Sequence, residues 1–296
     1  MKRAINFAVL LLVVACATAP AVPLNRYGLA VVPDVATYER FARADPDKRL
    51  VDLSAIGIPL DIRYATGNNF MKKTLYPVAK AYLRAPAARA LVAVQRELAD
   101  RGLGIKVFDA YRPYRVTEAM WEPIKDPDYV ADPAKGSRHN RGAAVDLTLI
   151  DLKTGAELPM PTPYDDFTSR ASHAFSDLPA DALANRALLR EVMTKHGFEP
   201  LPSEWWHYDF GGWERFELMD VGLEELVSSR VAKTTRDPLP TERVSRIGRG
   251  SRAEARDDTG CQNRVTMLTD PTLYVSDVSY ARSIWNRGQA RPAPMV

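Results

Sequence analysis

Two short segments of this sequence combine residue types that can hold a metal ion and use it for hydrolysis. One, residues 137–146, contains His139 and Asp146, and a later one contains Glu204 and His207. Two imidazoles and a carboxylate are ligands of the kind that a catalytic zinc ion takes, with a fourth position kept for water. A further carboxylate such as Glu204 can take the proton that this water loses. The two segments are therefore candidates for the two halves of one hydrolytic zinc centre.

The elements around these segments would have to bring the two halves together. Apolar and polar residues alternate over residues 143–150 and again over 206–210, which is the two-residue period of a strand. A loop before the first strand would carry His139, and Asp146 would lie within the strand. An acid within an apolar strand is costly unless something pairs with it.

Each of these residues also has a simpler explanation. Asp146 could form a buried salt bridge with Arg112 or Arg141, and His207 could be a half-exposed strand histidine. Residues three apart point to opposite faces of an ideal strand. Glu204 and His207 can therefore share a site only if the chain bends between them.

A candidate for charge stabilisation is found in residues 108–113. Attack of water on an amide builds negative charge on the carbonyl oxygen, and a fixed cation should meet that charge. Arg112 directly follows a predicted strand over 105–109 and is held by Pro113. The alternative is a structural arginine paired with Asp109.

Helices and strands are mixed along the chain without a regular βαβ rhythm. Helices are predicted over 85–101 and 179–196, the second capped by Gly197, with a strand within 50–65 and a loop over 159–167. We therefore expect an α+β fold with a small, mostly antiparallel sheet flanked by helices.

The first residues have the features of an export signal. Lys2 and Arg3 precede an apolar run over 4–15, which is short for a bilayer span and is followed by small residues and prolines. Cys16 ends the run as in a bacterial lipobox and is a candidate for lipidation and membrane attachment. The alternative is ordinary cleavage after the small residues 17–19. Both predict an exported protein, in the periplasm or as a membrane-anchored lipoprotein.

The rest of the chain divides by composition into a linker over 20–33, a catalytic domain over 34–230 and a tail over 231–296, after a signal segment over 1–19. The tail holds 11 of the 40 Lys and Arg but 7 of the 37 Asp and Glu, and its sparse apolar residues predict disorder. The remainder, with 29 basic and 30 acidic residues, is close to neutral. That balance argues against nucleic-acid binding.

Taken together, these motifs resemble those of the zinc D,D-peptidases, which include D-alanyl-D-alanine carboxypeptidases and dipeptidases. The resemblance covers roughly residues 51–226 and is closest to the dipeptidase branch. It is carried by the segments YATGNNF (64–70), DAYRP (109–113), SRHNRGAAVDLTL (137–149), MPTPYD (160–165) and EWWHY (204–208). The tail has no counterpart in this family.

The resemblance implies a role for each candidate residue. It implies one zinc ion per chain, held by His139, Asp146 and His207. It makes Glu204 the base that activates water and then the acid that protonates the leaving amine. It makes Arg112 the residue that stabilises the tetrahedral intermediate.

The resemblance also implies how the substrate, D-Ala-D-Ala, would be bound during cell-wall turnover or antibiotic resistance. It places Asp165 and Tyr64 near the free ammonium group and Ser137 near the carboxylate. A carboxylate such as Asp165 would exclude acylated substrates, because it would be buried without a partner.

Three other functions fit parts of the pattern. A D,D-carboxypeptidase acting on peptidoglycan stem peptides would lack an amine-binding carboxylate, so Asp165 argues against it. A non-haem iron oxygenase also uses two histidines and an acid, but it has no use for Glu204. A wall-binding lipoprotein without catalysis could share the fold, and the complete set of Glu204, Arg112 and three ligands argues against it.

Overall fold

The computed structural model describes residues 21–127 and 129–236. The predicted signal segment with Cys16, and the part of the predicted tail beyond residue 236, lie outside these residues. Among the residues described, no helix is both long and apolar enough to cross a membrane.

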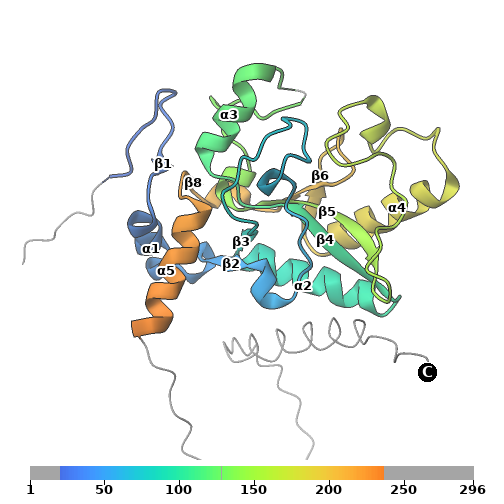
Figure 1. The fold of residues 1–296 in the computed structure, drawn as a ribbon, viewed down its shortest axis with the longest axis horizontal. Helices are drawn as coiled ribbons and strands as arrows, with labels where there is room; N and C mark the ends of the chain where they lie inside the picture. The colour runs from blue at the N-terminus through green and yellow to red at the C-terminus, as the bar shows by residue number, and fades with distance from the viewer. Residues whose placement is uncertain (1–20, 128, 237–296) are drawn as a thin grey trace, which may run out of the picture.

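A four-stranded antiparallel sheet forms the centre of the fold (Figure 1). Its strands, in spatial order, are β4 (Leu103–Asp109), β5 (Ala144–Asp151), β7 (His207–Phe210) and β6 (Phe198–Pro200). Residue alternation predicted the positions of β5 and β7, and the strand predicted over 105–109 corresponds to β4. The predicted α+β fold with a small antiparallel sheet is therefore confirmed.

The register of this sheet places three ionisable side chains abreast. Asp146 of β5 lies opposite His207 of β7 and, on its other side, opposite Asp109 of β4. Strand β4 reaches this alignment through an irregularity between Val107 and Asp109. A bulge of this kind re-aims the side chains at the end of a strand. Strand pairing thus gathers side chains that lie far apart in the sequence.

Two helices, α2 (Ala85–Ala99) and α4 (Ala180–Lys195), cover one face of the sheet. Helix α2 contacts β4, helix α4 contacts β5 and β6, and the two helices contact each other. Their bounds agree with the predicted ranges 85–101 and 179–196 to within two residues. In α2 the buried side chains recur every three or four residues, as an amphipathic helix requires; they include Ala87, Leu91, Val94 and Leu98.

Further helices and short strand pairs surround this core. The helices are α1 (Val35–Ala44), α3 (Tyr114–Ile124) and α5 (Leu223–Arg236). β1 (Val31–Val32) pairs in parallel with β8 (Leu218–Met219), and β2 (Leu50–Asp52) pairs antiparallel with β3 (Tyr82–Arg84). Short 3₁₀ helices span Pro46–Lys48, Leu53–Ile56, Arg63–Ala65, His139–Arg141, Ser169–Ala171 and Trp213–Arg215.

The structure differs from the predicted boundaries at both ends of the domain. The sequence predicts a linker over 20–33, yet Val31 and Val32 are buried because they pair with β8. At the other end, α5 continues across the predicted boundary at residue 230. The folded body is therefore longer than the predicted domain.

Arg84, which is fully buried, fixes the loop that carries His139 through hydrogen bonds to backbone carbonyl groups. The Arg84 Nε donates to the carbonyl oxygen of Arg141 at 2.7 Å, and a terminal nitrogen donates to that of Lys48. Gly142 ends the loop with a φ of +67°, and a Cβ there would lie 2.8 Å from a leucine methyl group. Glycine is the residue that fits this position.

Candidate metal and catalytic site

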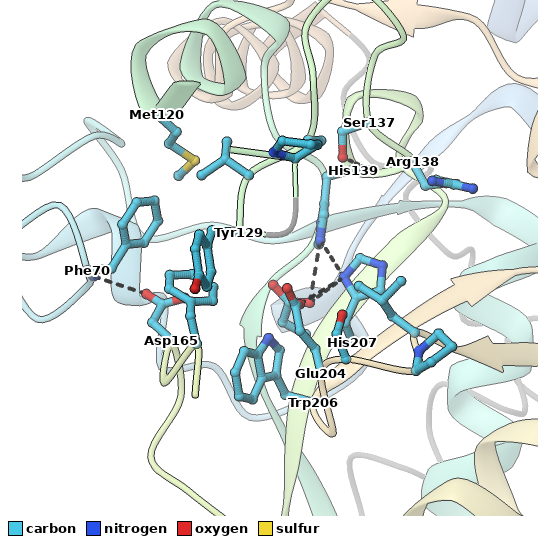
Figure 2. A pocket seen from close by; sticks show the side chains of 18 of the residues that line it. Phe70, Met120, Tyr129, Ser137, Arg138, His139, Asp165, Glu204, Trp206 and His207 are labelled. Carbon is cyan, nitrogen blue, oxygen red and sulfur yellow. Dashed lines mark hydrogen bonds and ion pairs between the residues drawn. The ribbon is translucent and has the colours of Figure 1, made fainter. Parts of the chain in front are cut away.

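A cavity of about 690 Å³ brings the predicted site residues together (Figure 2). It is lined by all eight side chains that the sequence analysis placed in the catalytic domain's site: Tyr64, Arg112, Ser137, His139, Asp146, Asp165, Glu204 and His207. They come from loops and strand ends spread over most of the domain. The cavity is therefore a product of the fold and not of any one motif.

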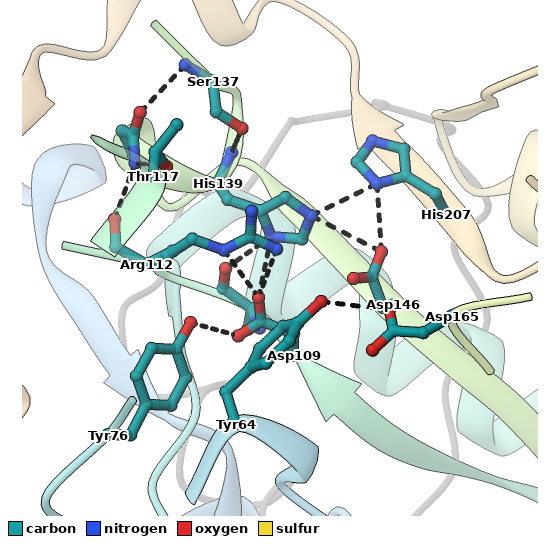
Figure 3. Close-up of polar contacts among 12 residues, drawn as sticks. Tyr64, Tyr76, Asp109, Arg112, Thr117, Ser137, His139, Asp146, Asp165 and His207 are labelled. Atoms are coloured by element: carbon teal, nitrogen blue, oxygen red, sulfur yellow. Dashed lines mark hydrogen bonds and ion pairs between the residues drawn. The ribbon is translucent and has the colours of Figure 1, made fainter. Parts of the chain in front are cut away.

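The three predicted ligands meet on one side of this cavity (Figure 3). His139 Nε2 lies 3.2 Å from His207 Nδ1 and 3.4 Å from Asp146 Oδ1, and the last two atoms are 2.9 Å apart. Ligands bound to one zinc ion at about 2.0–2.1 Å in tetrahedral geometry are separated by about 3.3 Å. The triangle of ligand atoms therefore has the size that such an ion needs.

The outward-facing atoms of each ligand are held by other groups. His139 Nδ1 lies 2.6 Å from the carbonyl oxygen of Ala110, and His207 Nε2 lies 3.0 Å from Asp209 Oδ1. Each of these nitrogens can donate its proton, which leaves the inner nitrogen of the ring with a free lone pair. Asp146 Oδ2 accepts from the hydroxyl of Tyr164 at 2.9 Å. Neither of the salt bridges considered for Asp146, to Arg112 or Arg141, is formed.

The electrostatics of the cluster favour a positive charge at its centre. Burial opposes the charged form of Asp146, yet His139 and His207 lower its pKa below the usual range. Burial likewise opposes a charged His207, yet its hydrogen bonds to Asp146 and Asp209 raise its pKa well above the ordinary value. The raised pKa of His207 reflects the negative charge of Asp146 and Asp209 beside it, and the same negative charge would attract a metal cation. Two nitrogens and a carboxylate oxygen form a donor set that suits zinc.

Glu204 lies beside the ligand cluster without belonging to it. Its Oε2 is 4.0 Å from His207 Nδ1. The chain bends here, as required: strand β7 begins only at His207, and the amide of Glu204 donates to the carbonyl oxygen of Leu201 at 3.1 Å. Burial raises the pKa of Glu204 to about 7. A carboxylate with a pKa near neutrality can both accept and return a proton.

Arg112 reaches the cavity in a fixed orientation. Its Nε and Nη2 both donate to Asp109 Oδ2, at 3.0 and 2.8 Å, and its guanidinium lies 5.2 Å from the centre of the Tyr64 ring. Tyr76 donates to the other oxygen of Asp109 at 2.7 Å. The ion pair with Asp109 that the sequence suggested is therefore formed. It fixes the orientation of Arg112, which lines the cavity.

Asp165 lies at another part of the cavity wall. Its Oδ1 accepts from the Tyr64 hydroxyl at 3.0 Å, and its Oδ2 accepts from the amide of Phe70 at 3.2 Å. Its backbone has a φ of +63°, in the left-handed region. Burial raises the pKa of Asp165 to about 7. A half-buried carboxylate that faces a cavity is suited to pairing with a cationic ligand group.

The sequence analysis missed two residues that hold the ligands. Asp209 binds His207 and follows it by two residues, so strand periodicity placed both on one face and could have indicated the contact. Tyr164 binds Asp146 from a loop that is distant in sequence. No local pattern indicates that contact.

Comparison with known proteins matches residues 47–220 to the family Peptidase_M15, described as D-ala-D-ala dipeptidase. The D-alanyl-D-alanine dipeptidase of Escherichia coli (strain K12) is 38% identical over 163 residues, which cover 54% of this chain and 83% of that protein. The D-alanyl-D-alanine dipeptidase of Enterococcus faecium is 31% identical over 175 residues, 51% of this chain and 85% of that protein. A solved structure of VanYB in complex with D-Alanine-D-Alanine matches at 15% identity over 50% of this chain and 84% of that chain, with a TM-score of 0.31.

Proposed function

Because the chain belongs to the Peptidase_M15 family of D-ala-D-ala dipeptidases, we propose that it hydrolyses D-Ala-D-Ala to two molecules of D-alanine with one zinc ion per chain. The observation that carries the proposal is the shared cavity. It holds the ligands His139, Asp146 and His207, the carboxylate of Glu204 and, at a separate part of its wall, Asp165.

The chemistry of this site follows from its proton-transfer and charged groups. Zinc held by the three ligands would act as a Lewis acid and lower the pKa of water. Glu204 takes the proton that the attacking water loses and returns it to the nitrogen of the leaving D-alanine. Arg112 stabilises the negative charge that builds on the carbonyl oxygen. Asp165, supported by Tyr64, binds the ammonium group of the first residue.

Asp165 would also select the length of the substrate. A free dipeptide presents an ammonium group one residue before the scissile bond, whereas an acylated peptide presents a neutral amide there. The acylated substrate would leave the Asp165 carboxylate buried and without its ion pair, which costs binding energy. We therefore infer a dipeptidase and not a carboxypeptidase that trims longer stem peptides.

Release of D-alanine tests this function directly. Purified protein is incubated with D-Ala-D-Ala or N-acetyl-D-Ala-D-Ala, with and without a chelator. We expect cleavage of the free dipeptide alone, and only in the absence of the chelator. Equal cleavage of both substrates would identify a carboxypeptidase. A protein that binds metal but cleaves neither would support the wall-binding alternative.

Asp165→Asn is expected to lower kcat/KM for D-Ala-D-Ala by about 10- to 100-fold, the factor that corresponds to the loss of one ion-paired hydrogen bond. The matched control is Asp166→Asn. Asp166 is the neighbouring carboxylate, it does not line the cavity, and its Oδ1 accepts from the amide of Thr168 at 2.9 Å. Steady-state kinetics of both variants compare the two positions. A similar loss in both variants would show that Asp165 has no special role.

We further propose that the protein is exported and acts on dipeptides released during cell-wall turnover. The support is the basic and apolar leader over residues 2–15 with Cys16 at its end. An exported dipeptidase would meet wall-derived dipeptides. Mass spectrometry of the mature protein is expected to show a new N-terminus at or shortly after Cys16. An intact N-terminus in the cytosol would contradict the proposal.

A further inference from the structure

The cavity has a second cation besides Arg112. Arg138 lines it on the side opposite Asp165, and Figure 2 shows His139, His207 and Glu204 between the two. Arg138 comes directly after Ser137, which also lines the cavity. The cavity therefore has a carboxylate at one end and a guanidinium at the other.

Arg138 is held in place by two neighbours. Its Nε lies 3.4 Å from Asp209 Oδ2, and its guanidinium carbon lies 4.7 Å from the centre of the Trp213 ring. Asp209 is itself fixed by its hydrogen bond to His207. Within the described part of the chain, no ion pair or hydrogen bond engages the two terminal nitrogens of Arg138. A planar guanidinium with two such donors matches a carboxylate in bidentate geometry.

The acidic groups of the cavity wall give a further cation a role in binding an anionic group. Its wall carries the carboxylates of Asp146, Asp165, Glu204 and Asp209, which would repel the carboxylate of a dipeptide. Arg112 is already paired with Asp109 through two nitrogens.

Ser137 supplies a suitable second donor beside Arg138. Its Oγ accepts from the amide of His139 at 3.2 Å, which leaves the proton of the hydroxyl to be donated. A carboxylate that reached this end of the cavity would meet a guanidinium and a hydroxyl from consecutive residues. The guanidinium would supply a positive charge for the carboxylate, and the two donors together would fix the orientation of the carboxylate.

We propose that Arg138 is a specificity-determining residue that binds the C-terminal carboxylate of the leaving D-amino acid. The inference rests on the proposed dipeptidase function and extends it. Asp165 would bind the ammonium group of a zwitterionic dipeptide and Arg138 would bind its carboxylate. The site would therefore recognise both charged ends of the substrate. Their opposite signs also fix the direction in which the dipeptide lies across Glu204 and the metal ligands.

The test compares D-Ala-D-Ala with D-alanyl-D-alaninamide, which lacks the terminal negative charge. The wild-type protein is expected to prefer the acid by about 10- to 100-fold in kcat/KM, the factor of one charge-assisted contact. Arg138→Gln should remove most of this preference, mainly by raising KM for the acid. Arg138→Lys should restore part of it, since it keeps the charge without the planar geometry.

Arg170→Gln is the matched control, because Arg170 is an exposed arginine next to the cavity residue Ser169 and does not line the cavity. It should keep the wild-type preference. Metal content and thermal melting show whether each variant is folded and loaded. A preference unchanged in Arg138→Gln, or lost equally in Arg170→Gln, would overturn the inference while leaving the dipeptidase function intact. A wild-type protein inactive on D-Ala-D-Ala would overturn both.

Discussion

Glu204→Gln is expected to lower kcat for D-Ala-D-Ala by about 10²- to 10⁴-fold, the usual contribution of a positioned general base and acid. The glutamine side chain has the same shape but can neither accept nor return the proton. KM should change little, because Glu204 lies beside the ligand cluster and Asp165 would remain to bind the ammonium group. Steady-state kinetics on the purified variant measure both values.

Metal content distinguishes a catalytic role of Glu204 from a ligand role. Its Oε2 lies 4.0 Å from the nearest ligand nitrogen, so the variant should bind as much metal as the wild type. Glu199→Gln, at an exposed position on β6 outside the cavity, is the matched control and should keep wild-type kcat. Loss of metal in Glu204→Gln, or a kcat within a few-fold of wild type, would contradict the assigned role.

His139→Ala is expected to abolish metal binding and to lower activity by at least about 10³-fold, since a bound metal ion contributes several kcal/mol to such reactions. The variant loses one of three protein ligands and leaves Asp146 and His207 without their neighbour. Elemental analysis of the purified protein gives the metal content, and D-alanine release gives the activity.

Thermal melting supplies a readout that is independent of catalysis. A ligand that binds only the folded state stabilises it, so chelator should lower the Tm of the wild type and leave that of His139→Ala unchanged. His196→Ala is the control, because His196 binds Glu97 at 2.8 Å and does not line the cavity. If His196→Ala lost metal as well, or if His139→Ala kept it, the ligand assignment would be wrong.

The sequence predicts the central strands well because their signal is local. Alternation over 143–150 and 206–210 marks β5 and β7 directly. The register between them is not local, and neither is the irregularity that brings Asp109 level with Asp146. The pairing of β1 with β8 joins two-residue strands from opposite ends of the domain. Segments this short carry no periodic pattern, so the predicted linker extended too far.

In the site, too, some residues could be identified from local sequence motifs, whereas others depend on contacts between distant segments. His139, Asp146 and His207 could be selected because their residue types and the surrounding motifs are visible in the sequence. Tyr164 could not, since only the folded chain brings its loop to Asp146. Arg138 was visible within the motif, but its position depends on Trp213, which comes from a distant 3₁₀ helix.

The backbone conformation and burial of Asp165 lower the stability of the folded protein, whereas its carboxylate is proposed to serve activity. The backbone of Asp165, with a φ of +63°, lies in the left-handed region, which favours glycine and which aspartate tolerates better than most other residues. Burial also raises its pKa from 3.8 to about 7, so the folded state binds the proton more tightly and stability falls as pH rises through that range. Selection for stability alone would therefore remove this carboxylate, and efforts to make the protein more robust should leave it in place.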